Sequence, residues 1–254
     1  MQRLAHWLIA PEKRIIKLGF LTVIAVVLFF ILTQFADIMS FILNFNDPQN
    51  QAFVKWASGD ESDRRALVTI QHEACPNAPF ILPTDGFIGL LYADPRGPYS
   101  RANPHQGIDI FSETEPGITP VYAAYDGYIT RESTWRSALI QRVPDDPLHH
   151  GEQIWLYYAH MADRDGNSFI ADAFPAGTQE RFVEQGSLLG YTGDYNGTAA
   201  RQIWVHLHFS IVRDDGNGRY RNELDFNNTK DPSPYLGMTL NYKESPITTD
   251  CVIN

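Results

Sequence analysis

The sequence predicts a mainly β protein, in which a small antiparallel β-sheet domain follows one N-terminal transmembrane helix. Residues 18–36 form an apolar run that contains no charged side chain. From about residue 79 onward, short runs rich in Val, Ile, Tyr and Phe alternate with Gly, Pro, Asn and Asp, a spacing typical of antiparallel strands. The length of 254 residues and the hydrophobic content of 44% fit one packed domain with attachments.

The apolar run at residues 18–36 has the length and the flanks of a membrane anchor. A helix of about 20 apolar residues spans the hydrocarbon core of a bilayer. Four basic residues precede the run and Asp37 and Asp47 follow it, so the positive-inside rule places residues 1–17 in the cytoplasm and the rest outside the cell membrane. A cleaved signal peptide is the alternative, although residues 33–36 make a weak cleavage site. The lack of a polar stripe argues against a buried core helix.

The segments that follow the anchor are a juxtamembrane stalk (37–78), the folded domain (79–241) and a C-terminal tail (242–254). Within the stalk, residues 60–72 have helical character, with Asp60 or Ser62 as a possible N-cap. Strands are expected at 120–124, 127–131, 138–143, 153–160 and 204–212. Asp126-Gly127 predicts a hairpin turn, because Asp-Gly pairs tolerate positive φ angles.

Composition limits the class of partner. The chain has 20 Lys and Arg against 30 Asp and Glu, and its net charge of −10 argues against a nucleic-acid partner, which requires a basic surface. The two cysteines, Cys75 and Cys251, form no CxxC motif, so zinc-ribbon and thioredoxin-like sites are not indicated. In an oxidising compartment the two could form a disulfide. Two unrelated free thiols are the alternative.

Two histidines share one face of the predicted strand at residues 204–212. Alternate residues of a strand point to the same side, so His206 and His208 face one way while the apolar residues between them face the core. Neutral imidazole is a common zinc ligand, which gives a reason for this pairing. A solvent-facing strand that carries two histidines by chance is the alternative.

A second pattern surrounds His105 and Asp109. Asp109 lies between two isoleucines, which predicts a strand that begins near Gly107, and Pro104 argues against a helix through His105. A bend at residues 106–107 would return His105 to the start of this strand. His with Asp suits a zinc ligand set. A turn histidine beside a surface aspartate is the alternative.

His160 ends the apolar run at 153–160 and shares its parity with Leu156 and Tyr158. A single histidine at a strand end is more often structural than catalytic, so it gains meaning only in combination with the other motifs.

In combination these motifs resemble those of the lysostaphin-like, or LytM-type, zinc peptidases. Residues 105–109 (His-Gln-Gly-Ile-Asp) are similar to the family's HxGxD motif, residues 158–160 to its YxH motif and residues 206–209 to its HLHF motif. The connecting segments 120–127 and 182–193 are similar as well, and the motifs occur in the family's order.

The resemblance implies a small β domain with a groove, the architecture known as a duplicated hybrid motif. The ligands it implies for Zn²⁺ are His105, Asp109 and His208, and the catalytic histidines it implies are His160 and His206. We further expect Tyr158 and Tyr195 to line the substrate groove.

The function implied is a zinc-dependent endopeptidase that hydrolyses peptide cross-links of bacterial cell-wall peptidoglycan. The chain contains no HExxH motif, so the glutamate general base that this motif carries in other metalloproteases is not indicated. It contains no GxSxG motif either, so a serine nucleophile is not indicated. The alternative is a non-catalytic cell-wall-binding or regulatory module that activates another wall hydrolase. A zinc peptidase that acts on a protein or on a peptide outside peptidoglycan is the third alternative.

Three long loops, at 144–151, 162–181 and 194–203, are expected to wall the groove. The first carries His149 and His150, which its polar turn composition predicts to be exposed.

Overall fold

The computed structural model describes residues 47–199 and 203–252. The chain divides into two compact units, Met1–Gln51 and Ala52–Asn254, and only residues 47–51 of the first are described. The predicted cytoplasmic segment 1–17 and the predicted anchor 18–36 lie outside the described residues. Within the described ranges, no helix combines the length and the apolar character needed to cross a membrane.

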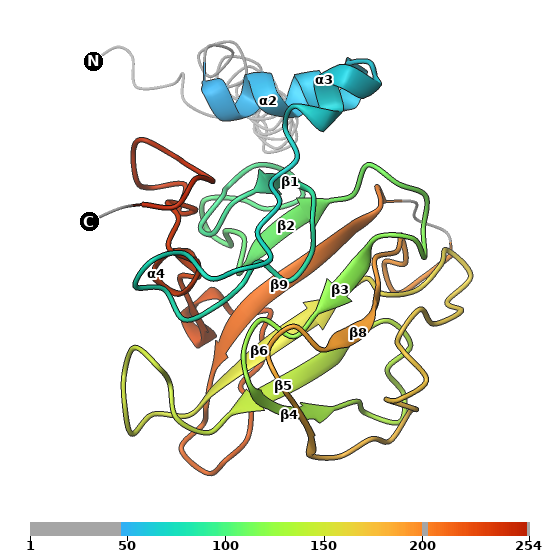
Figure 1. Ribbon diagram of the computed structural model, residues 1–254, viewed down its shortest axis with the longest axis vertical. Coiled ribbons are helices and arrows are strands. Elements are labelled where there is room, and N and C mark those ends of the chain that lie inside the picture. The colour runs from blue at the N-terminus through green and yellow to red at the C-terminus, as the bar shows by residue number, and fades with distance from the viewer. Residues whose placement is uncertain (1–46, 200–202, 253–254) are drawn as a thin grey trace, which may run out of the picture. The chain divides into compact units, whose positions relative to one another are not determined.

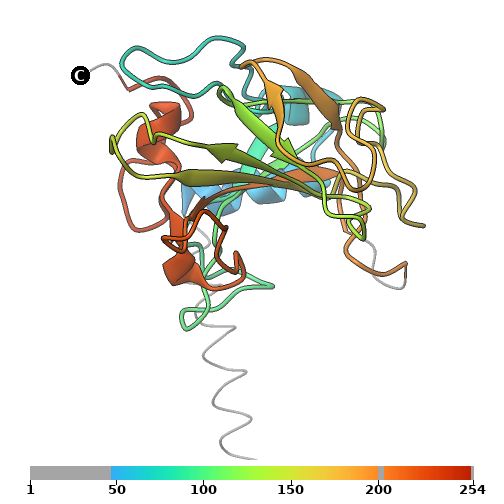
Figure 2. The same cartoon turned by 90° about the horizontal axis from the view of Figure 1, so that it is seen from below.

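The second unit is built on an antiparallel sheet, as the sequence predicts (Figure 1). In spatial order its strands are β1 (Phe87–Leu90), β2 (Ile108–Phe111), β9 (His206–Arg213), β6 (Ile154–Ala159), β5 (Leu139–Val143), β4 (Gly127–Thr130) and β7 (Arg181–Val183). A further short strand, β10 (Thr229–Lys230), pairs with β9. The two-stranded sheet of β3 (Pro120–Tyr122) and β8 (Leu188–Tyr191) forms a second layer over one face (Figure 2).

The hydrophobic core lies between these two layers. Leu207, Phe209 and Ile211 of β9 are completely buried there, in one cluster with Val121 of β3 and Leu189 of β8. The alternate residues of β9, which include the two histidines, lie on the opposite face of the sheet. The parity predicted for this strand is therefore confirmed.

The strands expected at 120–124, 127–131, 138–143, 153–160 and 204–212 are present as β3, β4, β5, β6 and β9, and the strand expected to begin near Gly107 is β2. The hairpin predicted at Asp126-Gly127 is wrong. A bend does occur there, but β3 pairs with β8 whereas β4 pairs with β5 and β7, so the segment passes from one sheet to the other. The local turn preference of Asp-Gly was recognisable, but the choice of strand partner depends on packing between the layers.

Two helices precede the sheet. Helix α2 (Pro48–Ser58) was not expected, and its residues Phe53 and Trp56 pack against aromatic side chains of β1 and β2. Helix α3 (Glu61–Arg65) begins at its N-cap Asp60, whose carboxylate accepts a hydrogen bond from the Asp63 amide at 2.9 Å. The helix ends well before residue 72, because Thr69 forms a bridge with Gly86.

The compact unit starts within the segment that the sequence analysis assigned to a stalk, and it includes described residues beyond 241. Cys75 and Cys251 are joined by a disulfide, with their Cα atoms 5.4 Å apart. This bond connects the segment before β1 to the segment after the last helix, α4 (Ser233–Leu236). Residues on both sides of the predicted domain boundaries are thus part of one folded body.

Candidate metal centre

The segment that carries His105 is held against strand β9 by a close backbone approach. A Cβ atom on Gly107 would lie only 2.2 Å from the Phe209 carbonyl oxygen, so no larger residue fits there without movement. The His105 amide donates a hydrogen bond to the Asp94 carbonyl at 2.9 Å, which turns the chain before β2. The bend predicted at 106–107 is therefore present, and it places His105 beside the start of the strand.

The three predicted ligands meet on the outer face of the sheet. Asp109 of β2 pairs directly with His208 of β9, and Asp109 Oδ1 lies 2.8 Å from His208 Nδ1. His105 Nε2 lies 3.1 Å from each of these two atoms. All three side chains are buried, and they form the one group with metal-binding geometry among the described residues.

Outer hydrogen bonds orient both imidazoles of this group. His105 Nδ1 lies 3.0 Å from the Leu91 carbonyl oxygen, which can only accept, so Nδ1 carries the proton and Nε2 presents a lone pair. His208 Nε2 lies 2.8 Å from a carboxylate oxygen of Glu223 and donates to it in the same way. Lone pairs of two imidazoles and one carboxylate therefore point at a common centre.

Such a centre requires a positive charge. Burial alone would lower the pKa of His208, but the carboxylates of Glu223 and Asp109 raise it to about 10. Burial alone would raise the pKa of Asp109, but the imidazoles of His105 and His206 hold it well below its usual value. Either a proton on His208 or a bound cation can supply the charge between these groups.

The geometry fits zinc. Ligand atoms 2.0–2.1 Å from a tetrahedral zinc ion lie about 3.3 Å from one another. The observed separations of 2.8–3.1 Å are close to this value. Two imidazole nitrogens and one carboxylate oxygen are typical of catalytic zinc sites, in which three protein ligands leave a fourth position for water or substrate.

His160 reaches the site through an unusual backbone conformation. By strand parity it would face the core with Tyr158, but its φ angle of 70° breaks the strand after Ala159 and redirects the side chain. Its Nδ1 donates to the Tyr195 carbonyl at 2.7 Å, and its ring lies 4.5 Å from that of His206. Burial and the neighbouring His206 lower the pKa of His160 to about 3, so the imidazole is neutral at pH 7.

His206 has a matching arrangement. Its Nδ1 donates to the Trp204 carbonyl at 2.7 Å, and its Nε2 lies 3.8 Å from Asp109 Oδ2, beyond hydrogen-bonding distance. Burial lowers the pKa of His206, and the nearby Asp109 carboxylate opposes this shift. The structure thus brings both predicted catalytic histidines to the metal-binding group, each with an unprotonated Nε2 when it is neutral.

A cavity of about 300 Å³ opens onto these groups. Asp109, His160 and His206 line it, and most of its other lining residues are aromatic or aliphatic. The aromatic wall residues are Phe53, Tyr99, Phe111 and Trp204. Phe53 comes from α2 and stacks on Trp204 with ring centroids 5.3 Å apart, so the helix before the sheet contributes to the cavity.

A larger cavity of about 730 Å³ lies around Arg142, Trp155 and Tyr220. None of the predicted site residues lines it. The larger cavity lacks the metal-binding group, so the smaller cavity is the candidate active site.

The groove assignment of Tyr158 is wrong. Its side chain is completely buried in the core, where its hydroxyl donates to Gln141 at 2.7 Å and accepts from the Ala124 amide at 3.0 Å. The neighbouring Tyr157 faces the site instead, with its ring 6.3 Å from that of His208. Tyr158 faces the core with Leu156 by ordinary strand parity, and only His160 is turned toward the site, by its positive φ angle.

Tyr195 contributes through its backbone rather than its ring. Its carbonyl orients His160, whereas its hydroxyl donates to the Gly197 carbonyl at 3.0 Å. Asn196 and Ile203 of the same long loop line the cavity, as expected for the 194–203 loop. The 162–181 loop supplies no residue to the cavity lining.

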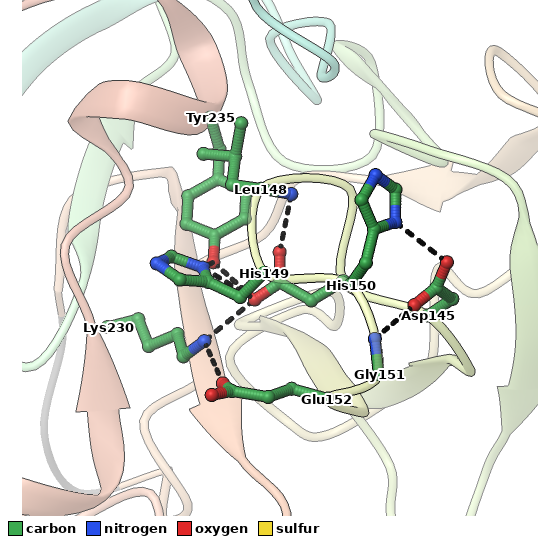
Figure 3. A network of polar contacts seen from close by, with 9 residues as sticks. Asp145, Leu148, His149, His150, Gly151, Glu152, Lys230 and Tyr235 are labelled. Atoms are coloured by element: carbon green, nitrogen blue, oxygen red, sulfur yellow. Dashed lines mark hydrogen bonds and ion pairs between the residues drawn. The ribbon is translucent and has the colours of Figure 1, made fainter.

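The loop at 144–151 does not wall the cavity. Its histidines contact acidic residues of their own loop (Figure 3). His149 Nδ1 lies 3.2 Å from Asp146 and His150 Nδ1 lies 2.9 Å from Asp145. Their side chains are 54% and 80% exposed, respectively, which confirms the prediction of exposure. The buried carboxylate of Asp146 also binds Lys230 and Tyr235, so this loop is fixed to the body of the domain.

Sequence reasoning missed Glu223, Tyr99 and Phe53. Glu223 stands in a polar loop without a recognisable motif, and its role follows from its distance to His208 alone. Tyr99 stacks on His105 with ring centroids 4.4 Å apart, although a Pro-Tyr pair in a loop indicates no such contact. The apolar residues of α2 were the available signal for Phe53, since they predict a helix face that must be covered.

Neither the protein-family models nor the curated proteins compared with the chain match it. Among solved structures, a candidate glycyl-glycine endopeptidase LytM from Ruminococcus gnavus is 24% identical over 56% of this chain and 49% of its own, with a TM-score of 0.36. The catalytic domain of lysostaphin, an antimicrobial peptidase from Staphylococcus simulans, is 18% identical over 58% of this chain and 88% of its own, with a TM-score of 0.37. A candidate M23 peptidase from Pseudomonas aeruginosa is 18% identical over 66% of this chain and 53% of its own, with a TM-score of 0.33.

These solved structures belong to the family that the sequence motifs resemble. The match spans about half of the length of the Ruminococcus gnavus protein. Since the identities and TM-scores are low, the function proposed below rests on the residues of the site and on the motifs rather than on this likeness.

Proposed function

We propose that the chain is a zinc-dependent endopeptidase that hydrolyses peptide cross-links of bacterial peptidoglycan. The observation that carries this proposal is the convergence of three lone-pair atoms from His105, Asp109 and His208 within 3.1 Å of one another. Two further imidazoles, those of His160 and His206, line one cavity together with Asp109 of this group. A purely structural role would not require five such side chains in one place.

Each group has a task that follows from its surroundings. His105, Asp109 and His208 would hold the zinc ion, which when bound acts as a Lewis acid toward the peptide carbonyl and the attacking water. His160 and His206 donate from Nδ1 to backbone carbonyls, which leaves Nε2 of each as a proton acceptor. Because burial lowers the pKa of both imidazoles, both are neutral at pH 7 and can take a proton from the attacking water.

The same two histidines can return the proton to the leaving amine. When protonated, they can also stabilise the negative charge that develops on the carbonyl oxygen. The His206 side chain is buried and His160 is partly buried, which limits contact with bulk water and strengthens these interactions.

Peptidoglycan as the substrate is supported by the motifs that resemble those of lysostaphin-like enzymes. The predicted anchor at residues 18–36 would place the domain outside the cell membrane, where the wall lies. Attachment to that membrane through the N-terminal helix is part of the same proposal.

The test is hydrolysis of purified cross-linked peptidoglycan by the full chain, followed by chromatography of the released peptides. We expect release to stop when a chelator removes the metal and to return when Zn²⁺ is added back. Activity that survives both metal removal and the His208→Ala substitution would overturn the proposal. An adaptor that activates another hydrolase would instead release no peptide alone.

A further inference from the structure

One ring nitrogen of His208 is bound from outside the metal-binding group. Its Nε2 lies 2.8 Å from Glu223 Oε1, on the side of the ring away from Asp109. The Glu223 side chain is only 14% exposed, so water competes poorly for this hydrogen bond. Glu223 does not belong to the group of three candidate ligands, and it therefore acts on the centre through His208.

The loop that carries Glu223 is fixed to the segment that carries His105. The side chain of Gln106, which is 3% exposed, donates from Nε2 to the Leu224 carbonyl at 3.2 Å. Gln106 follows the candidate ligand His105 in the chain, and Leu224 follows Glu223. The Gln106–Leu224 hydrogen bond therefore joins the two segments. This contact, together with the Glu223–His208 bond, connects the loop to both sides of the centre.

The loop also has internal support. The Asn222 carbonyl accepts from Asn228 Nδ2 at 2.9 Å, and the ring of Phe226 stacks on Tyr92 with centroids 4.9 Å apart. These contacts hold residues 222–228, and with them the Glu223 carboxylate, in place. A carboxylate placed in this way determines which nitrogen of His208 carries the proton and opposes rotation of the ring.

We propose that Glu223 is a positioning residue of the metal centre, and that Gln106 holds its loop in place. The carboxylate accepts the Nε2 proton of His208, so that Nδ1 presents its lone pair toward His105 and Asp109. The inference rests on the proposed function only in taking the metal to be zinc. It adds two residues that the motifs do not assign to metal binding.

The experiment measures the dissociation constant of Zn²⁺ itself, by competition with a chromophoric chelator, for the full chain and its variants. Outer partners of metal-bound histidines typically change metal affinity about 10–100-fold. We expect Glu223→Ala to weaken zinc binding by about this factor. Glu223→Gln should weaken it less, because the amide oxygen can still accept the hydrogen bond.

Glu244→Gln is the matched control, since it removes one carboxylate from an exposed position outside the centre. We expect its zinc affinity to equal that of the unsubstituted chain. A second readout is ¹⁵N NMR of the His208 ring in the zinc-loaded protein, which should show a proton on Nε2. Zinc affinity of Glu223→Ala within twofold of the control, or a proton on Nδ1, would overturn the role of Glu223.

Gln106→Leu tests whether the Gln106–Leu224 hydrogen bond holds the Glu223 loop in place. We expect it to weaken zinc binding in the otherwise unchanged chain but to add little once Glu223 is alanine, because coupled residues give non-additive effects. An equal loss in both backgrounds would show that Gln106 does not act through Glu223. Thermal unfolding of the metal-free variants separates a general loss of stability from a loss of zinc affinity.

The outcomes separate the two proposals. Weak zinc binding by Glu223→Ala, with no peptide release by the unsubstituted chain, would support the positioning role and overturn the peptidase. Peptide release by the unsubstituted chain, with unchanged zinc affinity in Glu223→Ala, would support the peptidase and overturn the positioning role.

Discussion

Asp109 and His208 lie directly opposite each other on adjacent antiparallel strands, and Asp109 Oδ1 is 2.8 Å from His208 Nδ1. Strand register alone brings them together, although 99 residues separate them in the chain. A shift of one residue would turn one of the two side chains to the other face of the sheet. The pairing of β2 with β9 therefore creates the centre.

Replacing the carboxylate of this pair should abolish tight zinc binding. Asp109→Asn retains the shape of the side chain but removes its charge, which the surrounding imidazoles and the metal require. We expect zinc affinity to fall by more than the roughly 100-fold upper value for outer partners. Zinc content after dialysis is the measurement. Asp85→Asn, at a partly exposed carboxylate beside His72, is the control and should retain its zinc.

Substitutions of His160 and His206 should separate catalysis from metal binding. His160→Asn suits the site because asparagine tolerates the positive φ angle of 70° at this position. We expect His160→Asn and His206→Gln to lower kcat by about 10²–10⁴-fold, the range for a lost general acid or base. Zinc content should remain stoichiometric in both. Loss of zinc along with activity would argue that these residues hold the metal instead.

Tyr158→Phe should affect stability and leave the chemistry intact. The hydroxyl bonds both Gln141 and the Ala124 amide in the core, so its removal leaves two buried polar groups without this partner. We expect the free energy of unfolding to fall by about 1–3 kcal/mol. Urea denaturation measures this change. A large change in KM for the folded variant would instead support a role of Tyr158 in substrate binding.

The buried network around Asp146 should make stability fall in acid. Burial would raise the pKa of Asp146, but hydrogen bonds from Lys230 and Tyr235 lower it below its usual value (Figure 3). A carboxyl whose folded-state pKa is lowered stabilises the fold above its unfolded pKa of about 3.9 and loses that contribution as the pH falls through the folded-state value.

Asp146→Asn tests this network. We expect the variant to be less stable than the unsubstituted chain by about 3 kcal/mol at pH 7, because Lys230 loses a buried partner. The difference should begin to shrink below about pH 4, where the carboxyl of the unfolded chain becomes protonated, and should be lost as the pH falls through the lowered folded-state pKa. Denaturation curves across the pH range provide the measurement. Asp145→Asn, on the exposed part of the same loop, should change stability little at any pH.

The disulfide should stabilise the domain substantially. Cys75 and Cys251 are 176 residues apart, and a cross-link across so long a loop restricts the unfolded chain strongly. We expect the double substitution to serine to cost about 2–5 kcal/mol. A reducing agent should destabilise the unsubstituted protein and have no effect on the double variant. Equal denaturation midpoints with and without reductant would contradict this.

The sequence predicted much of the sheet because its signal is local. The alternation of Leu207, Phe209 and Ile211 with the histidines specifies one core face and one site face, whichever strands lie beside them. The motifs identified all five histidine and aspartate positions that the structure gathers. The strand partners of β3 and the early end of α3 were not predictable, because both depend on contacts with distant segments.

What the sequence determined by itself was the chemistry available on each strand: two imidazoles on one face of β9 and one carboxylate between two isoleucines of β2. The tertiary structure decided which of these groups meet. It turned His160 toward the site through a positive φ angle, placed Tyr158 in the core and brought Glu223 to the outer nitrogen of His208. The physical reason is that parity describes a face within one strand, whereas a metal centre depends on register between strands and on the loops packed against them.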